Sequence, residues 1–184
     1  DNHIDEQYQS LGAAIQPVEP GSKEFRELET YVVSSQVKSK SIRVSNVFKI
    51  RRDSEAKDFT EQLPNQRKLF HGSRIQNWVG LLSRGILMPK VVVNLGVSRT
   101  DAGWLGNGIY FGDAACTSAF YTTPGKKKTR LMAVVNVALG KIKEFTKITY
   151  GLTEPPAGHH SCHGLRRTAK VDSEFADDEF VVYD

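Results

Sequence analysis

The sequence predicts an α+β fold in which short strands outnumber helices, and three observations lead to this prediction. Short apolar runs bounded by glycine, proline or charged residues recur along the chain, as expected of short strands. Apolar residues at helical spacing are confined to a few segments. Helical and strand patterns do not alternate regularly, which argues against a doubly wound parallel sheet.

The first third of the chain carries two helical and two strand patterns. The predicted elements are a polar arm over residues 1–20, a helix capped by Ser22, a strand over Ile42–Arg51, a helix over Ser54–Leu63 that Pro64 stops, and a strand over Lys68–Phe70. Ser22 is a favourable N-cap, and Phe25 and Leu28 lie one helical turn apart. Alternation of apolar and basic residues from Ile42 onward indicates a strand with one buried face.

Strand patterns and loops dominate the rest of the chain. The predicted elements are a helix over Ile75–Leu82 with Gly85 as C-cap, a strand over Met88–Val93, a long loop over Asn94–Gly108, a strand over Ile109–Phe111, a helix capped by Asp113, strands over Arg130–Leu139 and Ile142–Phe145, an irregular segment over Tyr150–Phe175, and a last strand over Phe180–Tyr183. The nearly unbroken apolar run at Arg130–Leu139 is typical of a strand at the centre of a sheet. A loop as long as Asn94–Gly108 is usually functional or disordered.

Length and composition fit one globular domain. The chain has 184 residues, 39% of them hydrophobic and 25% charged, which is enough to enclose a core. A net charge of +4 suits an anionic ligand such as a dinucleotide, but it is too small to indicate nucleic-acid binding. Two cysteines indicate a reducing compartment, no apolar run is long enough to span a bilayer, and the polar N-terminus is not a signal peptide. We therefore expect an intracellular protein, cytoplasmic or nuclear, that does not span a membrane.

A glycine turn led by a histidine follows the strand at Lys68–Phe70. From the end of a strand, His71 can donate a hydrogen bond to a ribose hydroxyl. Gly72 lets the backbone approach a planar ligand closely, because it has no Cβ, and Ser73 completes the tripeptide. Taken alone, the histidine could equally serve only to satisfy the turn.

A second glycine turn, Gly106–Gly108, leads into a strand that carries Tyr110. This run is no dinucleotide-binding fingerprint, because no third glycine follows and no helix opens at once. Ser118 and Tyr121 follow one helical turn apart, where a hydroxyl and a ring can bind a carboxamide and stack on its ring. Tyr110 and Tyr121 could then sandwich a nicotinamide; the alternative is that both tyrosines belong to the core.

Three acidic residues, Asp177, Asp178 and Glu179, precede the last apolar run. A carboxylate at the start of a strand can point into a cleft, and crowding or partial burial would disfavour its charge. A solvated acidic turn is the alternative. Together, His71, Tyr110 and Glu179 on short strands predict a site that holds a nicotinamide dinucleotide and breaks its glycosidic bond.

Three further groups of residues are expected to have structural roles. Metal-ligand residue types cluster at His159, His160, Cys162 and His163. Their spacing is too compressed for a zinc site and no distant pair completes it, so no metal is expected. Lys126–Lys128 is typical of a solvated hairpin loop, and Cys116 has no histidine beside it in sequence that would activate a nucleophile.

These motifs together resemble the poly(ADP-ribose) polymerase catalytic domain, a diphtheria-toxin-like ADP-ribosyltransferase, over nearly the whole chain. The segments that carry the resemblance are Val47–Ile50, Leu69–Arg74, Leu82–Gly85, Gly106–Phe111, Thr117–Ala119 with Tyr121, Val137–Gly140, His163–Leu165 and Glu179–Tyr183. Within the family, the segments most similar to its vault branch are Asn77–Gly80, Leu152–Pro156 and Asp177–Tyr183.

The resemblance implies an ADP-ribosyltransferase fold of two packed, mainly antiparallel sheets with a few short flanking helices. Residues 1–20 would be a polar arm and residues 21–184 the catalytic domain, which in the family continues past Tyr183 with at least one more strand. NAD+ would be the co-substrate, without a metal, and ADP-ribose would pass to protein acceptors. In the family, an intact His–Tyr–Glu set goes with competence to elongate poly(ADP-ribose) chains, so the resemblance implies that this domain is able to do so.

The same resemblance assigns roles by position. His71 would bind the adenosine-side ribose, Gly72 and Ser118 the carboxamide, and Tyr110 and Tyr121 the two faces of the nicotinamide. We therefore expect a catalytic set of Glu179, His71 and Tyr110, and an NAD-binding set of His71, Gly72, Ser73, Tyr110, Ser118 and Tyr121.

Three other functions compete with this one. A catalytically silent module that binds NAD or ADP-ribose would be favoured by loss of the carboxylate or the histidine, and both are present. A phosphate-removing transferase of the RNA-repair type would need several arginines at the nucleotide cleft, and the aromatic pair argues against it. A basic nucleic-acid binder would show salt-dependent DNA binding, but direct nucleic-acid binding is not expected of this domain.

Overall fold

The computed structural model describes residues 2–59, 63–86, 88 and 103–184. Its helices are α1 (His3–Ser10), α2 (Lys23–Ser34), α3 (Asp53–Asp58), the 3₁₀ turn η1 (Ile75–Asn77), α4 (Trp78–Arg84) and α6 (Ala115–Ala119). Its strands are β1 (Ala14–Pro17), β2 (Phe48–Arg51), β3 (Gln66–Gly72), β4 (Ile109–Gly112), β5 (Met132–Ala138), β6 (Ile142–Phe145), β7 (Ser161–Gly164) and β8 (Glu179–Val182).

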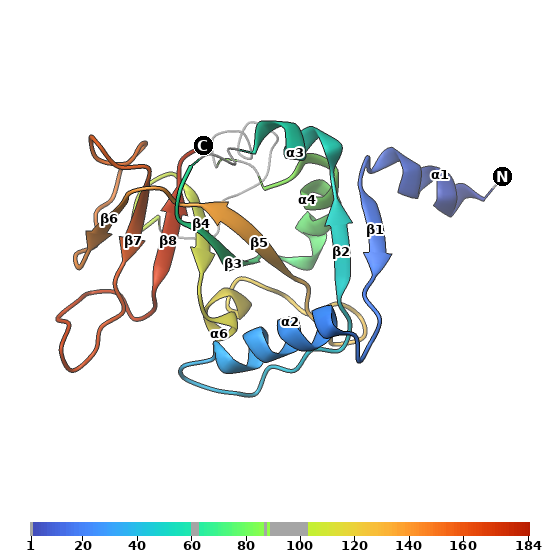
Figure 1. The fold of residues 1–184 in the computed structure, drawn as a ribbon, viewed down its shortest axis with the longest axis horizontal. Helices are drawn as coiled ribbons and strands as arrows, with labels where there is room; N and C mark the ends of the chain where they lie inside the picture. Colours follow the sequence, from blue (N-terminus) through green and yellow to red (C-terminus); the bar gives the residue numbers. More distant parts are fainter. Residues whose placement is uncertain (1, 60–62, 87, 89–102) are drawn as a thin grey trace.

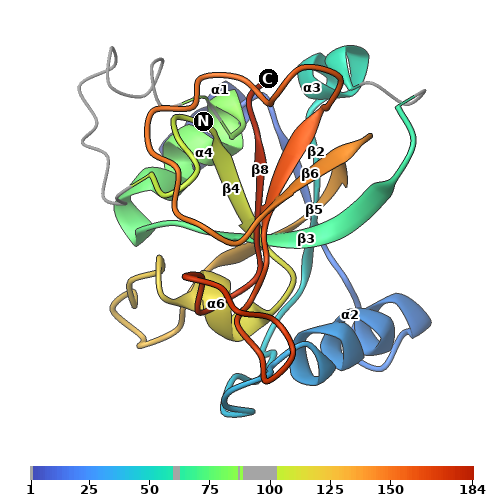
Figure 2. The same cartoon turned by 90° about the vertical axis from the view of Figure 1, so that its left-hand side faces the viewer.

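The strands form two sheets, which confirms the predicted α+β class. A six-stranded sheet has the order β5-β3-β4-β8-β7-β6, and β1 pairs with β2 in a separate two-stranded sheet (Figure 1). All pairings are antiparallel except β6 with β7. Helices α2 and α6 lie at one end of the large sheet, and α3 and α4 lie at the other (Figure 2).

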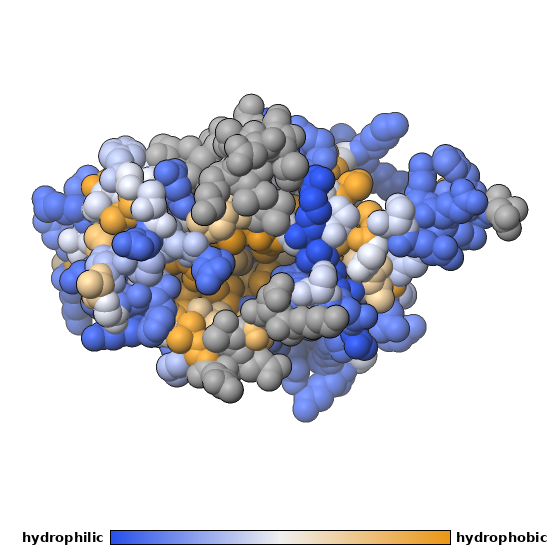
Figure 3. All heavy atoms as spheres, turned by 90° about the horizontal axis from the view of Figure 1, so that it is seen from above, coloured by the Kyte–Doolittle hydropathy of each residue, from blue (hydrophilic) through white to orange (hydrophobic). Residues whose placement is uncertain are grey.

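Two apolar clusters form the core around the six-stranded sheet. One contains Leu69, Phe111 and Phe180, and the other contains Phe175 and Val181. Neighbouring residues of β8 therefore belong to different clusters, because successive side chains of a strand point to opposite faces. Figure 3 shows apolar residues gathered near the middle of one face, whereas the end formed by α1 is hydrophilic.

The polar arm predicted for residues 1–20 contains regular structure. Asn2 caps α1 by accepting a hydrogen bond from the Ile4 N–H at 3.1 Å, and β1 follows. The Tyr8 hydroxyl accepts from the Ile15 N–H at 2.9 Å and so ties α1 to β1. The strand was missed because four residues are too few to show an alternating pattern.

The strand predicted over Ile42–Arg51 is wrong in its length and in its burial. Only β2 forms, and both apolar side chains on one of its faces are exposed, Phe48 by 51% and Ile50 by 43%. The predicted buried face is therefore not observed, because no layer of the described chain covers this face of the two-stranded sheet.

The most apolar run of the chain does form β5, but its predicted central position is wrong. Among the described strands, β5 pairs only with β3 and ends the sheet. Val137 joins the core, whereas Val134 is 37% exposed. An apolar run indicates that a strand is buried, but it does not specify how many other strands pair with it.

The helix predicted after Asp113 forms as α6, but Asp113 does not cap it. The N-cap is Ala114, which offers no side-chain hydrogen bond. Instead, the Ala115 N–H donates to the Ser35 hydroxyl at 3.0 Å, from just beyond the end of α2. A cap supplied by a distant residue leaves no local signal in the sequence.

The remaining predictions are confirmed with changed boundaries. The helix after Pro20 is capped by Ser22 as expected, and Gly85 ends α4 with a φ of 81°. The helix expected to reach Leu63 is shorter, and the segment expected to be irregular up to Phe175 contains β7. The predicted strand over Met88–Val93 and most of the loop over Asn94–Gly108 lie outside the described residues.

None of the helices within the described residues has the length and apolar character that crossing a bilayer requires.

Candidate active site

An opening between β3 and β4 is the structural origin of the candidate site. The two strands pair at Phe70 and Gly112, and the ladder between them does not extend to His71 and Gly72, with which β3 ends. Those last residues pair with β5 on the other side. Figure 2 shows β3 running across the direction of β4. The histidine and the glycine therefore lie where the sheet divides, which is a place where backbone groups can face a ligand.

Gly72 packs directly against α6. A Cβ at this position would lie 2.0 Å from the Ser118 carbonyl oxygen and 3.1 Å from a methyl of Thr122, so only glycine fits. The buried Ser118 hydroxyl donates to the Phe70 carbonyl at 3.1 Å. Gly72 and Ser118 are therefore neighbours, as they must be if both are to bind the carboxamide of one nicotinamide.

Glu179 is the first residue of β8, and glycines flank it on both neighbouring strands. It pairs with Gly112 of β4 and with Gly164 of β7. A Cβ on Gly112 would lie 3.0 Å from the Ser118 Oγ, so the serine hydroxyl reaches the glycine that pairs with Glu179. Because paired residues place their side chains on the same face, the Glu179 carboxylate and Ser118 belong to one region of the molecule.

Tyr110 lies two residues before Gly112 and shares its face of β4. Its hydroxyl donates to the Gly106 carbonyl at 2.6 Å and accepts from the Leu105 N–H at 3.0 Å. The ring packs against the cluster that contains Phe175. Tyr110 is therefore both a core residue and a candidate ligand-facing residue, so the two alternatives for it are compatible.

His71 is oriented by the backbone of β4. Its Nδ1 lies 2.9 Å from the Tyr110 carbonyl oxygen, and its ring tilts against Phe111 with centroids 5.6 Å apart. Because a carbonyl only accepts, Nδ1 carries the proton, and Nε2 of the neutral ring is an acceptor. Toward a ribose hydroxyl the neutral ring would therefore accept, rather than donate as the sequence suggested.

The two remaining predicted residues lie beside this group. Tyr121 is 41% exposed at the end of α6, and its N–H donates to the Ser118 carbonyl at 3.2 Å. Ser73 follows Gly72 directly, and its hydroxyl accepts from the Asn77 side-chain amide at 3.0 Å. The structure thus gathers the seven predicted residues around β3, β4, α6 and the start of β8.

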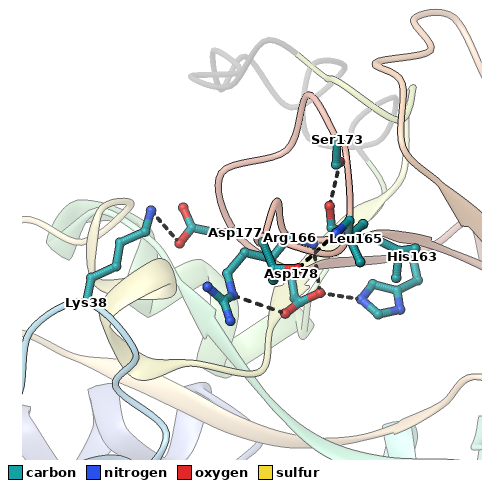
Figure 4. Close-up of polar contacts among 9 residues, drawn as sticks. Lys38, His163, Leu165, Arg166, Ser173, Asp177 and Asp178 are labelled. Atoms are coloured by element: carbon teal, nitrogen blue, oxygen red, sulfur yellow. Dashed lines mark hydrogen bonds and ion pairs between the residues drawn. The ribbon is translucent and has the colours of Figure 1, made fainter.

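The three acidic residues before Phe180 do not form one crowded cluster. Asp177 pairs with Lys38 at 2.9 Å, whereas Asp178 accepts from His163 at 2.8 Å and from the Arg166 N–H at 3.0 Å (Figure 4). Burial raises the pKa of Asp178, but these hydrogen bonds outweigh it and hold that pKa below its ordinary value. Two of the three carboxylates are thus engaged elsewhere, and sequence reasoning missed these partners.

A pocket of about 220 Å³ lies near these acids, between α2, α6 and the turn before β8. Asp113, Asp177 and Asp178 are among its lining residues. Burial raises the pKa of Asp113, and the nearby charge of Asp178 raises it further. Asp113 is therefore a destabilising carboxylate at neutral pH, and not the helix cap that the sequence suggested.

The histidine and cysteine cluster is divided among separate contacts. His160 Nδ1 accepts from the Lys141 N–H at 2.9 Å, and His159 contacts the Ala157 carbonyl. Cys162 is fully buried in the apolar core, and His163 binds Asp178. No group of three potential metal ligands occurs within the ranges that the structure describes.

Comparison with known proteins gives a family match over most of the chain. A family model described as "Poly(ADP-ribose) polymerase catalytic domain" matches residues 22–184. The human "Protein mono-ADP-ribosyltransferase PARP4" is 44% identical over 177 residues, covering 96% of this chain and 10% of that protein. "Poly [ADP-ribose] polymerase 1" of Arabidopsis thaliana is 35% identical over 94% of this chain and 18% of its own length. Human "Poly [ADP-ribose] polymerase 2" is 31% identical over 94% of this chain and 29% of its own length.

Proposed function

Because the chain belongs to the poly(ADP-ribose) polymerase catalytic domain family, we propose that it is an NAD+-dependent protein ADP-ribosyltransferase. It would cleave the bond between nicotinamide and ribose and transfer ADP-ribose to protein acceptors. The chain spans between about a tenth and three tenths of the three relatives described above, so this proposal concerns the domain alone. The observation that carries it is that Gly72, Ser118 and Glu179 lie beside the point where β3 and β4 separate, with His71 directly before Gly72 in β3.

The nicotinamide end of NAD+ would bind between α6 and the ends of β3 and β4. The backbone of Gly72 would hydrogen-bond the carboxamide. Since the Ser118 hydroxyl donates to the Phe70 carbonyl, its oxygen would accept from the carboxamide NH2. The rings of Tyr121 and Tyr110 would cover the two faces of the leaving ring.

Glu179 would stabilise the reacting ribose. Nicotinamide leaves as a neutral ring, so the leaving group needs no protonation, and the demand is to stabilise an oxocarbenium-like sugar. The ionised Glu179 carboxylate would accept a hydrogen bond from the 2′-hydroxyl of the nicotinamide ribose and support the positive charge that develops. The same carboxylate could orient an incoming acceptor hydroxyl.

His71 would hold the adenosine-side ribose of NAD+. The Tyr110 carbonyl fixes the orientation of its ring, so a neutral Nε2 would accept from a ribose hydroxyl. Fixing both ends of the dinucleotide would restrict the reacting bond to the neighbourhood of Glu179, which is a positioning contribution to the rate.

A second question is whether the domain transfers a single ADP-ribose unit to each acceptor site or elongates a chain. The intact set of His71, Tyr110 and Glu179 supports elongation of poly(ADP-ribose) chains. The human relative with 44% identity is named a mono-ADP-ribosyltransferase, which supports single transfers instead. Incubation with labelled NAD+ and an acceptor protein, followed by gel electrophoresis, separates the two outcomes, because single transfer gives a sharp band and elongation gives a smear.

The alternative is a catalytically silent module that binds NAD+ or ADP-ribose. Release of free nicotinamide from NAD+ by the purified domain would support the transferase and contradict this alternative. Tight binding of NAD+ without release of nicotinamide or labelling of any acceptor would contradict the proposed activity.

A further inference from the structure

We propose that His163 and Asp178 are positioning residues for Glu179, and that they fix from the opposite face of the sheet the direction in which its side chain points. This inference rests on the proposed function, because it assigns both residues to the same transfer reaction. Neither residue belongs to the predicted site.

Side chains alternate between the two faces of the sheet along β8. Asp178 and Phe180 flank Glu179 in the chain, so their side chains point to the face opposite that of Glu179. His163 of β7 contacts both of these neighbours. Its Nε2 lies 2.8 Å from the Asp178 Oδ1, and its ring stacks on Phe180 with centroids 4.0 Å apart and planes at 18°. One imidazole thus holds the residues on either side of Glu179.

Asp178 also extends the attachment of β8 to β7 beyond the ladder. The backbone pairing of these strands ends at Gly164 and Glu179. One residue further out, the Asp178 Oδ1 accepts from the Arg166 N–H at 3.0 Å, and its Oδ2 lies 3.9 Å from the Arg166 Nε (Figure 4). Pairing opens most easily at the end of a strand, so this carboxylate anchors β8 where Glu179 begins it.

The surroundings of His163 make this attachment rigid. Phe180 is fully buried, and the Arg67 guanidinium lies 4.6 Å from the centroid of its ring. The side chains of His163 and Asp178 are only 15% and 25% exposed, so water weakens their hydrogen bond little. The loop that leads back to β8 is closed by Ser173, whose hydroxyl donates to the Leu165 carbonyl at 2.6 Å.

The face that carries Glu179 explains why its backbone direction matters. Gly112 and Gly164 pair with Glu179, and the space above them is taken by Ser118 and by the ring of Phe175. The Glu179 side chain therefore has little room, and the direction of its Cα–Cβ bond, which Asp178 and Phe180 fix from the other face, decides where the carboxylate lies.

Steady-state kinetics of NAD+ cleavage test this inference. Asp178→Ala and His163→Ala should each lower kcat on the order of 10-fold to 10²-fold, because small misplacements of a catalytic group are costly. The KM for NAD+ should change by less than about threefold, since Glu179 acts mainly on the transition state. The double variant should lose little more than either single variant, because both act through one hydrogen bond. Asp178→Asn keeps an acceptor oxygen and should recover most of kcat.

A neighbouring carboxylate provides the control. Asp177 lies in the same turn as Asp178, and Asp177→Ala removes its ion pair with Lys38. The kcat of this variant should stay within about twofold of the wild-type value, because this ion pair does not involve His163. Equal losses in Asp177→Ala and Asp178→Ala would overturn the inference, as would full additivity of the two alanine variants at His163 and Asp178.

Crystal structures separate this inference from the proposed function. In Asp178→Ala, the Glu179 carboxylate should leave its wild-type position while Phe111 and Val181 of the core stay in place. A carboxylate that superposes on the wild type overturns the positioning role, whether or not the domain transfers ADP-ribose. A wild-type domain that releases no nicotinamide contradicts the proposed function, and the crystal comparison still decides the positioning role.

Discussion

Glu179 is the residue whose replacement tests the chemistry most directly. Glu179→Gln keeps the shape of the side chain and removes its charge, so the developing sugar cation would lose its counter-charge. We expect the rate of nicotinamide release to fall on the order of 10²-fold or more. Glu174→Gln, an exposed change in the loop before β8, should leave the rate unchanged. Near-normal release by Glu179→Gln would remove Glu179 from the catalytic role.

Replacement of Gly72 should affect both the stability of the domain and its binding of NAD+. Gly72→Ala would place a Cβ 2.0 Å from the Ser118 carbonyl oxygen, so β3 and α6 would have to separate. We expect a loss of unfolding free energy of about 1–3 kcal/mol, typical of overpacking, together with weaker NAD+ binding. Chemical denaturation and calorimetry measure the two effects.

The matched control for this change is Gly125→Ala. A Cβ at Gly125 would meet its nearest heavy atom at 3.8 Å, which is an ordinary contact. This variant should unfold like the wild type. If both alanine variants were equally stable, the close approach of Gly72 to α6 would not be a constraint.

At the scale of the element, α6 depends on α2 for the start of its backbone. Ser35→Ala leaves the Ala115 N–H without its acceptor, since the N-cap residue offers no side-chain hydrogen bond. The unfolding free energy should fall by about 0.5–2 kcal/mol, as for the loss of a helix cap. Ser34→Ala removes only a weak hydrogen bond at 3.5 Å to Tyr31, so a denaturant midpoint as low as that of Ser35→Ala would contradict this explanation.

The elements also show which local signals were sufficient. The cap at Ser22 and the turn at Gly85 depend on local geometry, and both were predicted correctly. The cap of α6 and the place of β5 at the end of the sheet that the described strands form depend on segments far away in the sequence, so the predicted cap at Asp113 and the predicted central position were wrong. Local patterns fix local conformation, whereas neighbours across a sheet are chosen by the packing of the whole domain.

At the scale of the whole molecule, two carboxylates predict opposite responses to acid. The folded state lowers the pKa of Asp178 below its ordinary 3.8, so its stabilisation is present above that value and is lost as the pH falls through the folded pKa. The folded state raises the pKa of Asp113, so protonation of Asp113 adds stability as the pH falls.

Thermal unfolding followed by circular dichroism between about pH 6 and pH 2 measures this balance. Asp178→Asn should show a smaller loss of midpoint temperature toward acid than the wild type. Asp113→Asn should show a larger loss, because it removes a group that gains stability on protonation. The same acid dependence in all three proteins would show that these carboxylates do not govern acid unfolding.

The family and the general architecture were predictable from the sequence. The resemblance to the poly(ADP-ribose) polymerase catalytic domain, and within it to the vault branch, is confirmed by the family match and by the human relative. The α+β class with two sheets is confirmed as well. The site assignments remain predictions, although the structure brings their residues together.

The motifs and the chemistry they can carry are readable from the amino-acid sequence, because a histidine before a glycine or a glutamate before an apolar run needs only its own segment. Folding is needed to show that Gly72 meets α6, that two glycines flank Glu179, and that His163 holds the residues on both sides of it. These contacts join segments separated by tens of residues. They are specified by how strands pair and cores pack, so no short stretch of the sequence contains them.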